Sequence, residues 1–147
     1  MSKATPTSHQ ITLLVVEDDE ALRDAFACIL VHEGYMVLTA ATGHDAMGLL
    51  RTPLTPIDVV LLDVKLPDVS GVDLCARLRE IYPQLPVVVC TGQAEPEELA
   101  ALQKLGVRSC LCKPVAMDEL IAAIEDFVPL KETCGDGNPS LPRSSRR

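Results

Sequence analysis

The chain has almost no aromatic side chains. Among its 147 residues there is no Trp, and Tyr and Phe occur only twice each. Because 48% of the residues are nevertheless apolar, the core has to be built from Leu, Val, Ile and Ala. Aliphatic cores of this kind are typical of buried parallel strands that are covered by helices. The length fits one domain with a single core.

Long apolar runs and secretion signals are also lacking. No apolar run approaches the roughly 18–20 residues that are needed to span a bilayer. The polar segment 1–10 has no apolar core of a signal peptide, so we expect a cytoplasmic protein without membrane insertion. The six cysteines form no Cys-x-x-Cys pair and the three histidines do not cluster with them, which argues against a zinc site. Buried free thiols in a reducing compartment are the favoured interpretation.

Positive charge is scarce. The chain has 13 Lys and Arg against 21 Asp and Glu, which gives a net charge of −8. Residues 129–147 contain four basic and two acidic residues, so they carry +2 and residues 1–128 carry −10. An acidic domain is repelled by a phosphate backbone, so direct nucleic-acid binding by this domain is not expected.

Short apolar segments alternate five times with longer amphipathic ones. The short segments are aliphatic or β-branched and too short for helices, so they predict strands. They cover residues 11–16, 36–40, 57–62, 86–90 and 108–112. The amphipathic segments have the spacing of helices with one apolar face. They predict helices over residues 19–33, 43–51, 71–81, 96–105 and about 118–127, with Asp19 as the N-cap of the first.

This alternation predicts an α/β fold in which helices cover both faces of a parallel sheet, giving three layers, α/β/α. Right-handed crossovers leave few topologies. The commonest at this size is the flavodoxin-like, doubly wound (βα)5 sheet with strand order 2-1-3-4-5. We expect this domain to span residues 11–128. Segment 1–10 is predicted to be disordered, and segment 129–147, rich in Pro, Gly and Ser, to be a disordered tail or a truncated linker.

Polar side chains follow four of the five predicted strands. Glu17 and Asp18 follow the first strand, Asp63 the third, Thr91 the fourth and Lys113 the fifth. In such sheets, ligands bind beyond the carboxyl ends of the strands, where the strand order reverses. The first and third strands are neighbours about 4.8 Å apart, and only a long side chain can reach across the about 10 Å from the fifth strand to the third. Three crowded carboxylates require a counter-charge, and an open, water-rich Mg²⁺ site supplies one.

These segments resemble the receiver domains of response regulators in two-component signalling, including the chemotaxis receivers. The first strand and its acidic residues read LLVVEDDEALR, and the phosphoacceptor strand and its loop read DVVLLDVKLPDVSG. The strand that ends in a hydroxyl residue reads VVVCTG, and the strand that ends in Lys-Pro reads CLCKP. The resemblance covers about residues 10–128.

The resemblance implies a phosphoacceptor and a metal site. Asp63 would accept a phosphoryl group from a phosphohistidine on a sensor histidine kinase or a histidine phosphotransfer protein. Asp18 and Asp63 would bind Mg²⁺, or Mn²⁺ in its place, directly, and Glu17 would bind it through a water. The backbone carbonyl of Lys65 would be a further ligand.

The resemblance also implies a switch. Lys113 would pair with Asp63 at rest and with a phosphoryl oxygen afterwards, and the Lys113–Pro114 peptide bond would be cis. Thr91 would turn its hydroxyl to another phosphoryl oxygen. This movement would alter an interaction face formed by the last two predicted helices and the strand between them. The output would be a downstream protein target or a missing output domain.

One position departs from the family pattern. Three residues before the lysine, receivers usually carry Tyr or Phe, whose ring moves inward with the threonine, and here the residue is Cys110. A thiol is too small for that role, so we expect a smaller rearrangement than in relatives with an aromatic residue.

Two other functions are consistent with parts of this pattern. A phosphatase of the haloacid-dehalogenase type needs a second Asp two residues after the nucleophile, where this chain has Lys65. We therefore expect a regulatory domain rather than an enzyme, one that supports its own phosphorylation and autodephosphorylation chemistry. The main alternative is an interaction module of the same fold that works without phosphorylation. Cys110 favours this alternative, whereas the intact acidic, hydroxyl and lysine positions argue against it.

Overall fold

The structure is a computed structural model that describes residues 10–52, 56–92, 94–107 and 109–127. Within this part, five strands form one parallel sheet in the predicted order β2-β1-β3-β4-β5. The strands are β1 (Thr12–Val16), β2 (Met36–Ala40), β3 (Val59–Leu62), β4 (Val87–Thr91) and β5 (Ser109–Cys112). The helices are α1 (Glu20–His32), α2 (Gly43–Arg51), α3 (Gly71–Ile81), α4 (Pro96–Lys104) and α5 (Met117–Phe127). Apart from Gln10, the segments 1–10 and 129–147 lie outside the described residues.

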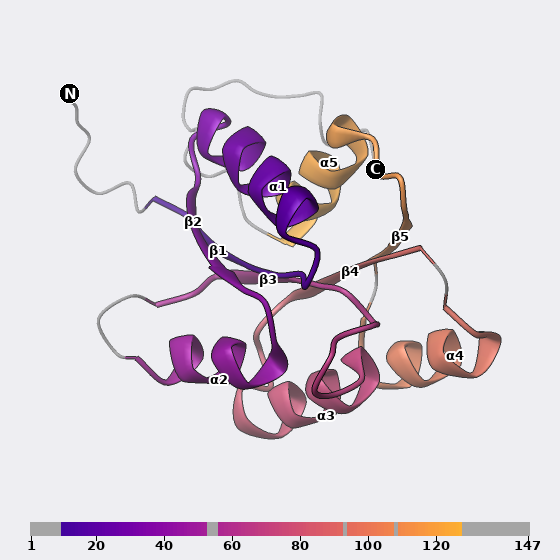
Figure 1. Cartoon of the computed structure of the whole chain (residues 1–147). Helices are drawn as coiled ribbons and strands as arrows, with labels where there is room; N and C mark the ends of the chain where they lie inside the picture. Colours follow the sequence, from indigo (N-terminus) through magenta and orange to yellow (C-terminus); the bar gives the residue numbers. More distant parts are fainter. Residues whose placement is uncertain (1–9, 53–55, 93, 108, 128–147) are drawn as a thin grey trace.

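The helices form one layer on each face of the sheet. Figure 1 shows α1 and α5 on one face and α2, α3 and α4 on the other, which confirms the flavodoxin-like, three-layer prediction. Every residue of β1, β3 and β4 is buried, as expected for the central strands of such a sheet. Among the described helices, none has the length and apolarity that a bilayer-spanning helix needs.

Alternate residues of the central strands contribute to two separate cores. Leu13 and Val15 belong to the cluster under α1 and α5, whereas Leu14 and Val16 belong to the cluster under α2, α3 and α4. This alternation follows from the period of two in a strand, where successive side chains point to opposite faces. Phe26 is the one aromatic residue among the buried described residues, and Leu, Val, Ile and Ala supply most of both clusters.

Side chains at the helix starts explain why the predicted helix boundaries are accurate. Asp19 accepts a hydrogen bond from the Leu22 amide at the start of α1, as predicted. Thr42 and Ser70 do the same for α2 and α3. Each such cap contributes about 1 kcal/mol. The strand β3 begins at Val59, two residues later than predicted.

The cysteines differ from the prediction of buried thiols. Cys75 and Cys90 are buried, but Cys28, Cys110 and Cys112 are exposed. The last two lie two residues apart and therefore on the same face of β5, which is an edge strand with a burial pattern that alternates between intermediate and exposed. The prediction was wrong for these residues because an apolar composition does not reveal which face of an edge strand is left uncovered. Cys134 is outside the described part of the chain.

Gly71 allows α3 to begin against the end of β3. A Cβ atom on Gly71 would lie 2.5 Å from the Cα of Val64 and 2.8 Å from the carbonyl oxygen of Asp63. Both neighbours are backbone atoms, so we predict that Gly71→Ala lowers the free energy of unfolding by about 1–3 kcal/mol, measured by urea denaturation. Gly48→Ala in α2 is the control, because its Cβ would meet nothing within 4 Å. It should raise that free energy by about 0.5–1 kcal/mol. Equal stability of the two variants would contradict this explanation of Gly71.

Candidate functional site

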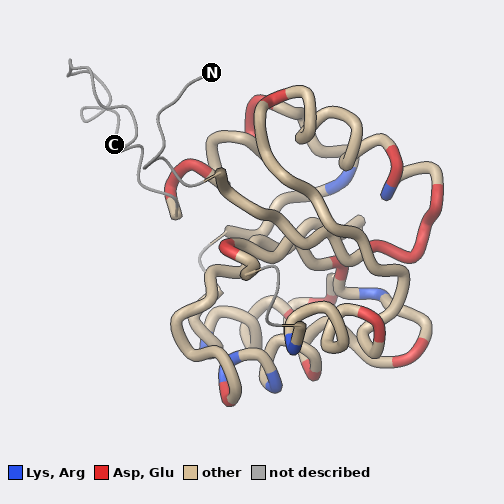
Figure 2. Tube along the Cα trace, turned by 90° about the vertical axis from the view of Figure 1, so that its left-hand side faces the viewer, with Lys and Arg blue, Asp and Glu red and all other residues tan. Residues whose placement is uncertain are grey.

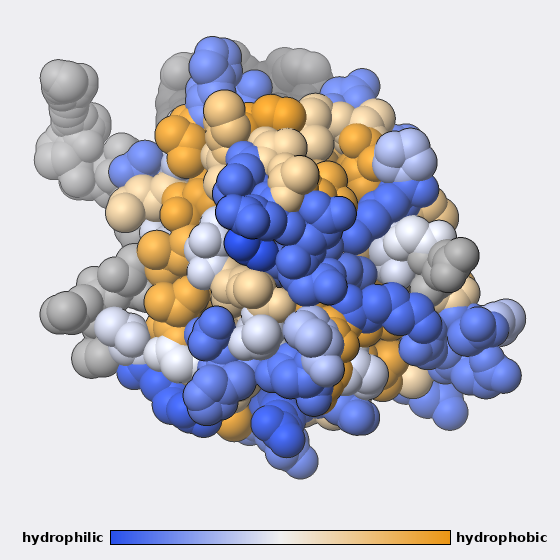
Figure 3. Space-filling view, viewed as in Figure 1, coloured by the Kyte–Doolittle hydropathy of each residue, from blue (hydrophilic) through white to orange (hydrophobic). Residues whose placement is uncertain are grey.

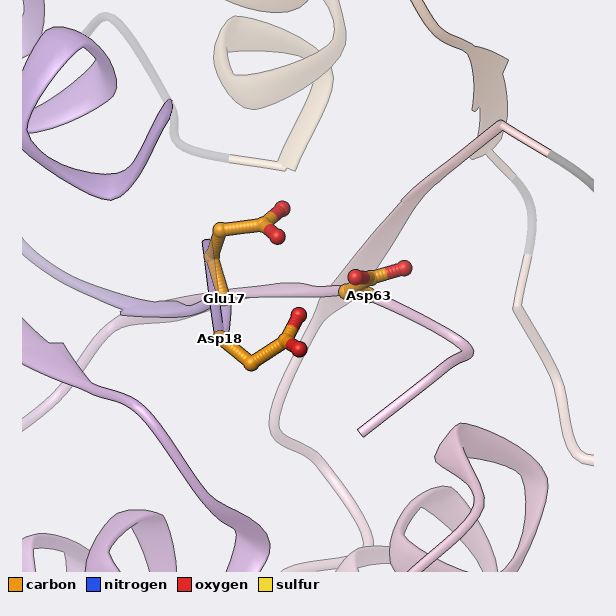
Figure 4. A group of neighbouring side chains, drawn as sticks. All are labelled: Glu17, Asp18 and Asp63. Atoms are coloured by element: carbon orange, nitrogen blue, oxygen red, sulfur yellow. The ribbon is translucent and has the colours of Figure 1, made fainter. Parts of the chain in front are cut away.

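Three carboxylates meet where β1 and β3 end. The parallel register pairs Val16 with Leu62, so the next residues along the chain, Glu17 and Asp63, leave the sheet side by side. Glu17 is 2% exposed and Asp63 6%, whereas Asp18 is exposed. One carboxylate oxygen from each of the three residues lies within 4.8 Å of the others. Figure 4 shows the three side chains extending toward a common space.

Lys113 provides the positive charge among these carboxylates. Its Nζ lies 2.7 Å from Oε1 of Glu17 and 3.4 Å from Oδ2 of Asp63. The predicted pairing with Asp63 is therefore present, but the shorter contact, to Glu17, was not predicted. The Lys113 amide also donates to the carbonyl of Thr91, a residue that is 4% exposed. The Lys113–Pro114 peptide bond is cis, as expected.

Burial and ion pairing have opposite effects on the pKa values of Glu17 and Lys113. Burial raises the pKa of Glu17, and the hydrogen bonds from Lys113 and the Asp19 amide only partly offset this effect. For Lys113, burial lowers the pKa, but the hydrogen bond to Glu17 and the negative charge of Asp63 outweigh it, so the pKa is raised. Lys113 therefore stays protonated at neutral pH. The formal charges of the three carboxylates and one ammonium sum to −2, which a divalent cation would neutralise.

The oxygen set fits a small divalent cation with water-filled positions. Two oxygens bound to the same Mg²⁺ can be at most about 4.2 Å apart, because each Mg–O bond is about 2.1 Å. The three oxygens lie within 4.8 Å of one another, so direct binding of one cation by all of them needs little movement, and a water between the cation and one carboxylate also suits this spacing. The amide of Lys65 donates to Oδ1 of Asp63 over 3.2 Å, so the backbone that carries the Lys65 carbonyl is attached to the Asp63 side chain.

Two further side chains hold the loops of the site, and neither was expected from the sequence. Arg23 in α1 donates from Nη1 to the carbonyl of Glu17 over 2.9 Å. Asp68, in the loop between β3 and α3, accepts hydrogen bonds from the amides of Gly43 and His44 at the start of α2, each 2.9 Å long. These contacts depend on how the loops fold back onto the helices, which no local sequence pattern encodes.

Cys90 lies next to Thr91 but does not offer an alternative nucleophile. Burial raises the pKa of its thiol to about 12, and the nearby Lys113 lowers it only in part. The thiolate, which is the reactive form, is therefore negligibly populated at neutral pH.

The surface around the carboxylates is polar and acidic. In Figure 2, the longest continuous acidic stretch of the trace is the run of four residues Glu17–Glu20 at the right. Figure 3 shows hydrophilic surface across the middle of the face that it presents, between the two helical layers. The acidic run beside the site attracts cations.

The fold and this site define a doubly wound α/β domain with a cluster of three acidic side chains at its strand-order switch. Residues 13–125 match the response regulator receiver domain family, and the chain belongs to that family.

Similar proteins are consistent with this assignment. The chain is 36% identical over 115 residues to the transcriptional regulatory protein GlrR of Escherichia coli K12, covering 78% of this chain and 25% of that protein. It is 33% identical over 132 residues to the response regulator MprA of a Mycobacterium species, covering 90% of this chain and 56% of that protein. The chain thus spans about a quarter to a little over half of these relatives.

Solved structures share the fold over most of the chain. A CheY-like response regulator receiver domain protein from Methanospirillum hungatei superposes with a TM-score of 0.78 and 28% identity, covering 86% of this chain and 100% of the other. A response regulator receiver protein from Pseudomonas putida gives a TM-score of 0.76 at 26% identity, covering 81% and 98%.

Asp68 predicts a stability that depends on pH. Hydrogen bonds from the Gly43 and His44 amides hold the pKa of Asp68 below its usual value of 3.8. A lowered folded-state pKa stabilises the protein above the unfolded pKa, and this stability is lost as the pH falls through the folded pKa. Asp68→Asn should therefore be less stable than wild type at pH 7, with a difference that shrinks below about pH 4. Urea denaturation at several pH values measures this, with Asp24→Asn on α1 as the control. A difference that does not depend on pH would contradict this role of the carboxylate.

Proposed function

We propose that this receiver domain accepts a phosphoryl group on Asp63 from a phosphohistidine of a sensor histidine kinase or a histidine phosphotransfer protein, in a reaction that depends on Mg²⁺. The observation that carries the proposal is the position of the Asp63 carboxylate. It is almost fully buried at the strand-order switch, beside two further carboxylates and 3.4 Å from the Lys113 ammonium.

The phosphoryl transfer needs a nucleophile and groups that stabilise the negative charge of the phosphoryl oxygens. A carboxylate oxygen of Asp63 forms a bond to phosphorus while the bond from phosphorus to the imidazole nitrogen breaks, and that nitrogen takes the electron pair. The product is an aspartyl phosphate. Lys113 stabilises the negative charge of the phosphoryl oxygens, and the hydroxyl of Thr91 donates to another of these oxygens.

The proposed cation would be held by Asp18 and Asp63 directly, by Glu17 through a water and by the carbonyl of Lys65. When bound, Mg²⁺ or Mn²⁺ neutralises charge on the transferring oxygens. The chain's own contribution is to hold three oxygens in place before the donor arrives. The shorter contact of Lys113 is to Glu17, so its ammonium offsets part of the carboxylate repulsion while it stays 3.4 Å from Asp63.

We propose a regulatory role for the domain, which returns to its resting state by autodephosphorylation. GlrR is a transcriptional regulatory protein by name and MprA is a response regulator. By analogy, we propose that the output of this chain passes to a downstream protein target or to an output domain. The contact face would consist of α4, β5 and α5, whose exposed acidic residues favour a basic protein surface. A cytoplasmic location is part of the same proposal.

The alternative is an interaction module that needs no phosphorylation. The observation in its favour is that Cys110, at the position of the usual aromatic residue, is exposed and small. Incubation with acetyl phosphate and Mg²⁺, followed by mass measurement of the intact protein, separates the two functions. A mass increase of one phosphoryl group supports the phosphoacceptor, and an unchanged mass supports the alternative.

Asp63→Asn is predicted to abolish phosphorylation without unfolding the protein, because the amide keeps the shape of the side chain but is not a nucleophile. Labelling from a phosphohistidine donor measures this, and circular dichroism checks the fold. Asp19→Asn is the matched control, because Asn also caps a helix and Asp19 is exposed beside the cluster. Substantial labelling of Asp63→Asn would mean that another residue is the acceptor.

Metal affinity should separate the roles of the two acidic residues after β1. Asp18→Asn removes a direct ligand and should weaken Mg²⁺ binding by more than about 100-fold, whereas Glu17→Gln removes an outer ligand and should weaken it by roughly 10–100-fold. Isothermal titration calorimetry with MgCl₂ measures both affinities. An unchanged affinity in Asp18→Asn would remove this residue from the proposed metal site.

A further inference from the structure

An ion pair connects the phosphoacceptor loop to α4. The Nζ atom of Lys65 lies 3.6 Å from Oε1 of Glu98, and the two side chains are 55% and 24% exposed. Lys65 is also attached to the acceptor through its backbone, because its amide donates to Oδ1 of Asp63. Its pairing with Ser70 in an isolated antiparallel bridge holds the same backbone against the start of α3. A single residue therefore contacts both Asp63 and α4.

The same oxygen of Glu98 also holds the first turn of α4. Oε1 accepts a hydrogen bond from the Glu95 amide over 2.9 Å, and the Glu95 side chain accepts in return from the Glu98 amide. This reciprocal arrangement is a capping box, which fixes the start of a helix. Any change in the position of the Glu98 carboxylate thus acts directly on the start of α4.

α4 is the described helix with the least support from the core. Leu102 is its single buried residue, whereas each of the other four helices has at least two. Elements with little buried apolar surface move at low cost in free energy. A modest change in charge at the first turn can therefore displace α4.

Phosphorylation of Asp63 would give the Lys65 ammonium a second anionic partner besides Glu98. An exposed pair such as Lys65–Glu98 is weak, because both charges remain hydrated. A phosphoryl group carries about −1.5 to −2 charges and several strong acceptor oxygens, two residues away in the chain. The lysine side chain is long and flexible, so its ammonium can move between the two partners.

We propose that the Lys65–Glu98 pair couples Asp63 to α4: a phosphoryl group on Asp63 draws the Lys65 ammonium away from Glu98, and the first turn of α4 responds. Glu98 is thus a positioning residue that acts through Lys65. This inference rests on the proposed function and adds a regulatory connection to the same site. It requires no aromatic ring at the position of Cys110.

The first test uses reciprocity, because a phosphoryl group that weakens the ion pair must itself bind better when the pair is absent. The probe is beryllofluoride with Mg²⁺, which mimics the phosphoryl group. Glu98→Gln keeps an acceptor for the capping box, since Gln also serves at this position. It should bind the probe roughly 1.5- to 5-fold more tightly than wild type, the range that corresponds to a weak surface pair.

Two controls separate this coupling from a general effect of charge. Glu97→Gln removes a neighbouring carboxylate from the first turn of α4 and should leave the affinity as in wild type. In a Lys65→Met background, Glu98→Gln should have no further effect, because the ammonium that it would release is gone. An equal gain in Glu97→Gln, or a gain that persists without Lys65, would overturn the proposal.

Amide chemical shifts provide the second test. In wild type, beryllofluoride should shift the amides of Glu95 and Glu98, and these shifts should fall by more than half in Lys65→Met. The shift of the Val64 amide beside Asp63 should remain in both proteins. Full shifts at Glu95 and Glu98 in Lys65→Met would overturn the coupling and leave the proposed function intact. No shift at Val64 in any protein would mean that the probe does not bind at Asp63, and the proposed function itself would fail.

Discussion

The structure depends on a crowding of negative charge that the sheet itself imposes. Because β1 and β3 are parallel neighbours, their register brings Glu17 and Asp63 together at the point where both strands end. Two carboxylates with exposures of 2% and 6% would be strongly unfavourable without compensation. Lys113 reaches them from β5, and its ion pairs with both are the compensation. The strand order thus brings the carboxylates together, and the long Lys113 side chain offsets part of their negative charge.

A site of this kind costs stability, and the surrounding chain offsets that cost. The central strands are fully buried and aliphatic, and their alternate residues supply two cores rather than one. The loop after Asp63 is held at two points. Asp68 attaches it to the start of α2, and Gly71 allows α3 to begin against its backbone. Asp63 therefore stands at the end of a buried strand of the sheet, and the loop that follows it is anchored to two helices.

Much of this arrangement could be predicted from the sequence, because it rests on local periodicity and on the residues directly after each strand. The bounds of α2 and α3 agree with the prediction, and in the structure the side chains of Thr42 and Ser70 cap these helices. The predicted site residues Glu17, Asp18 and Asp63 do come together. Contacts set by the paths of the loops could not be predicted: the preference of Lys113 for Glu17, the attachment by Asp68 and the pairing of Lys65 with Glu98. The exposure of Cys110 and Cys112 also escaped prediction, because it depends on what the helices leave uncovered at the edge strand β5.

The exposed Cys110 bears on how such a domain can signal. An aromatic ring that moves into a cavity changes how the core is packed. Because a protein interior is close-packed, the ring can occupy only a few distinct positions. A lysine that leaves a carboxylate for a phosphoryl group instead transmits the signal through charge. Because Lys65 is exposed, its ion pairs contribute little free energy. A ligand shifts a two-state equilibrium only by its differential free energy, so a weak link of this kind changes populations by a small factor. A domain built in this way would leave its partner to complete the change, because contacts with the displaced α4 add to the same equilibrium.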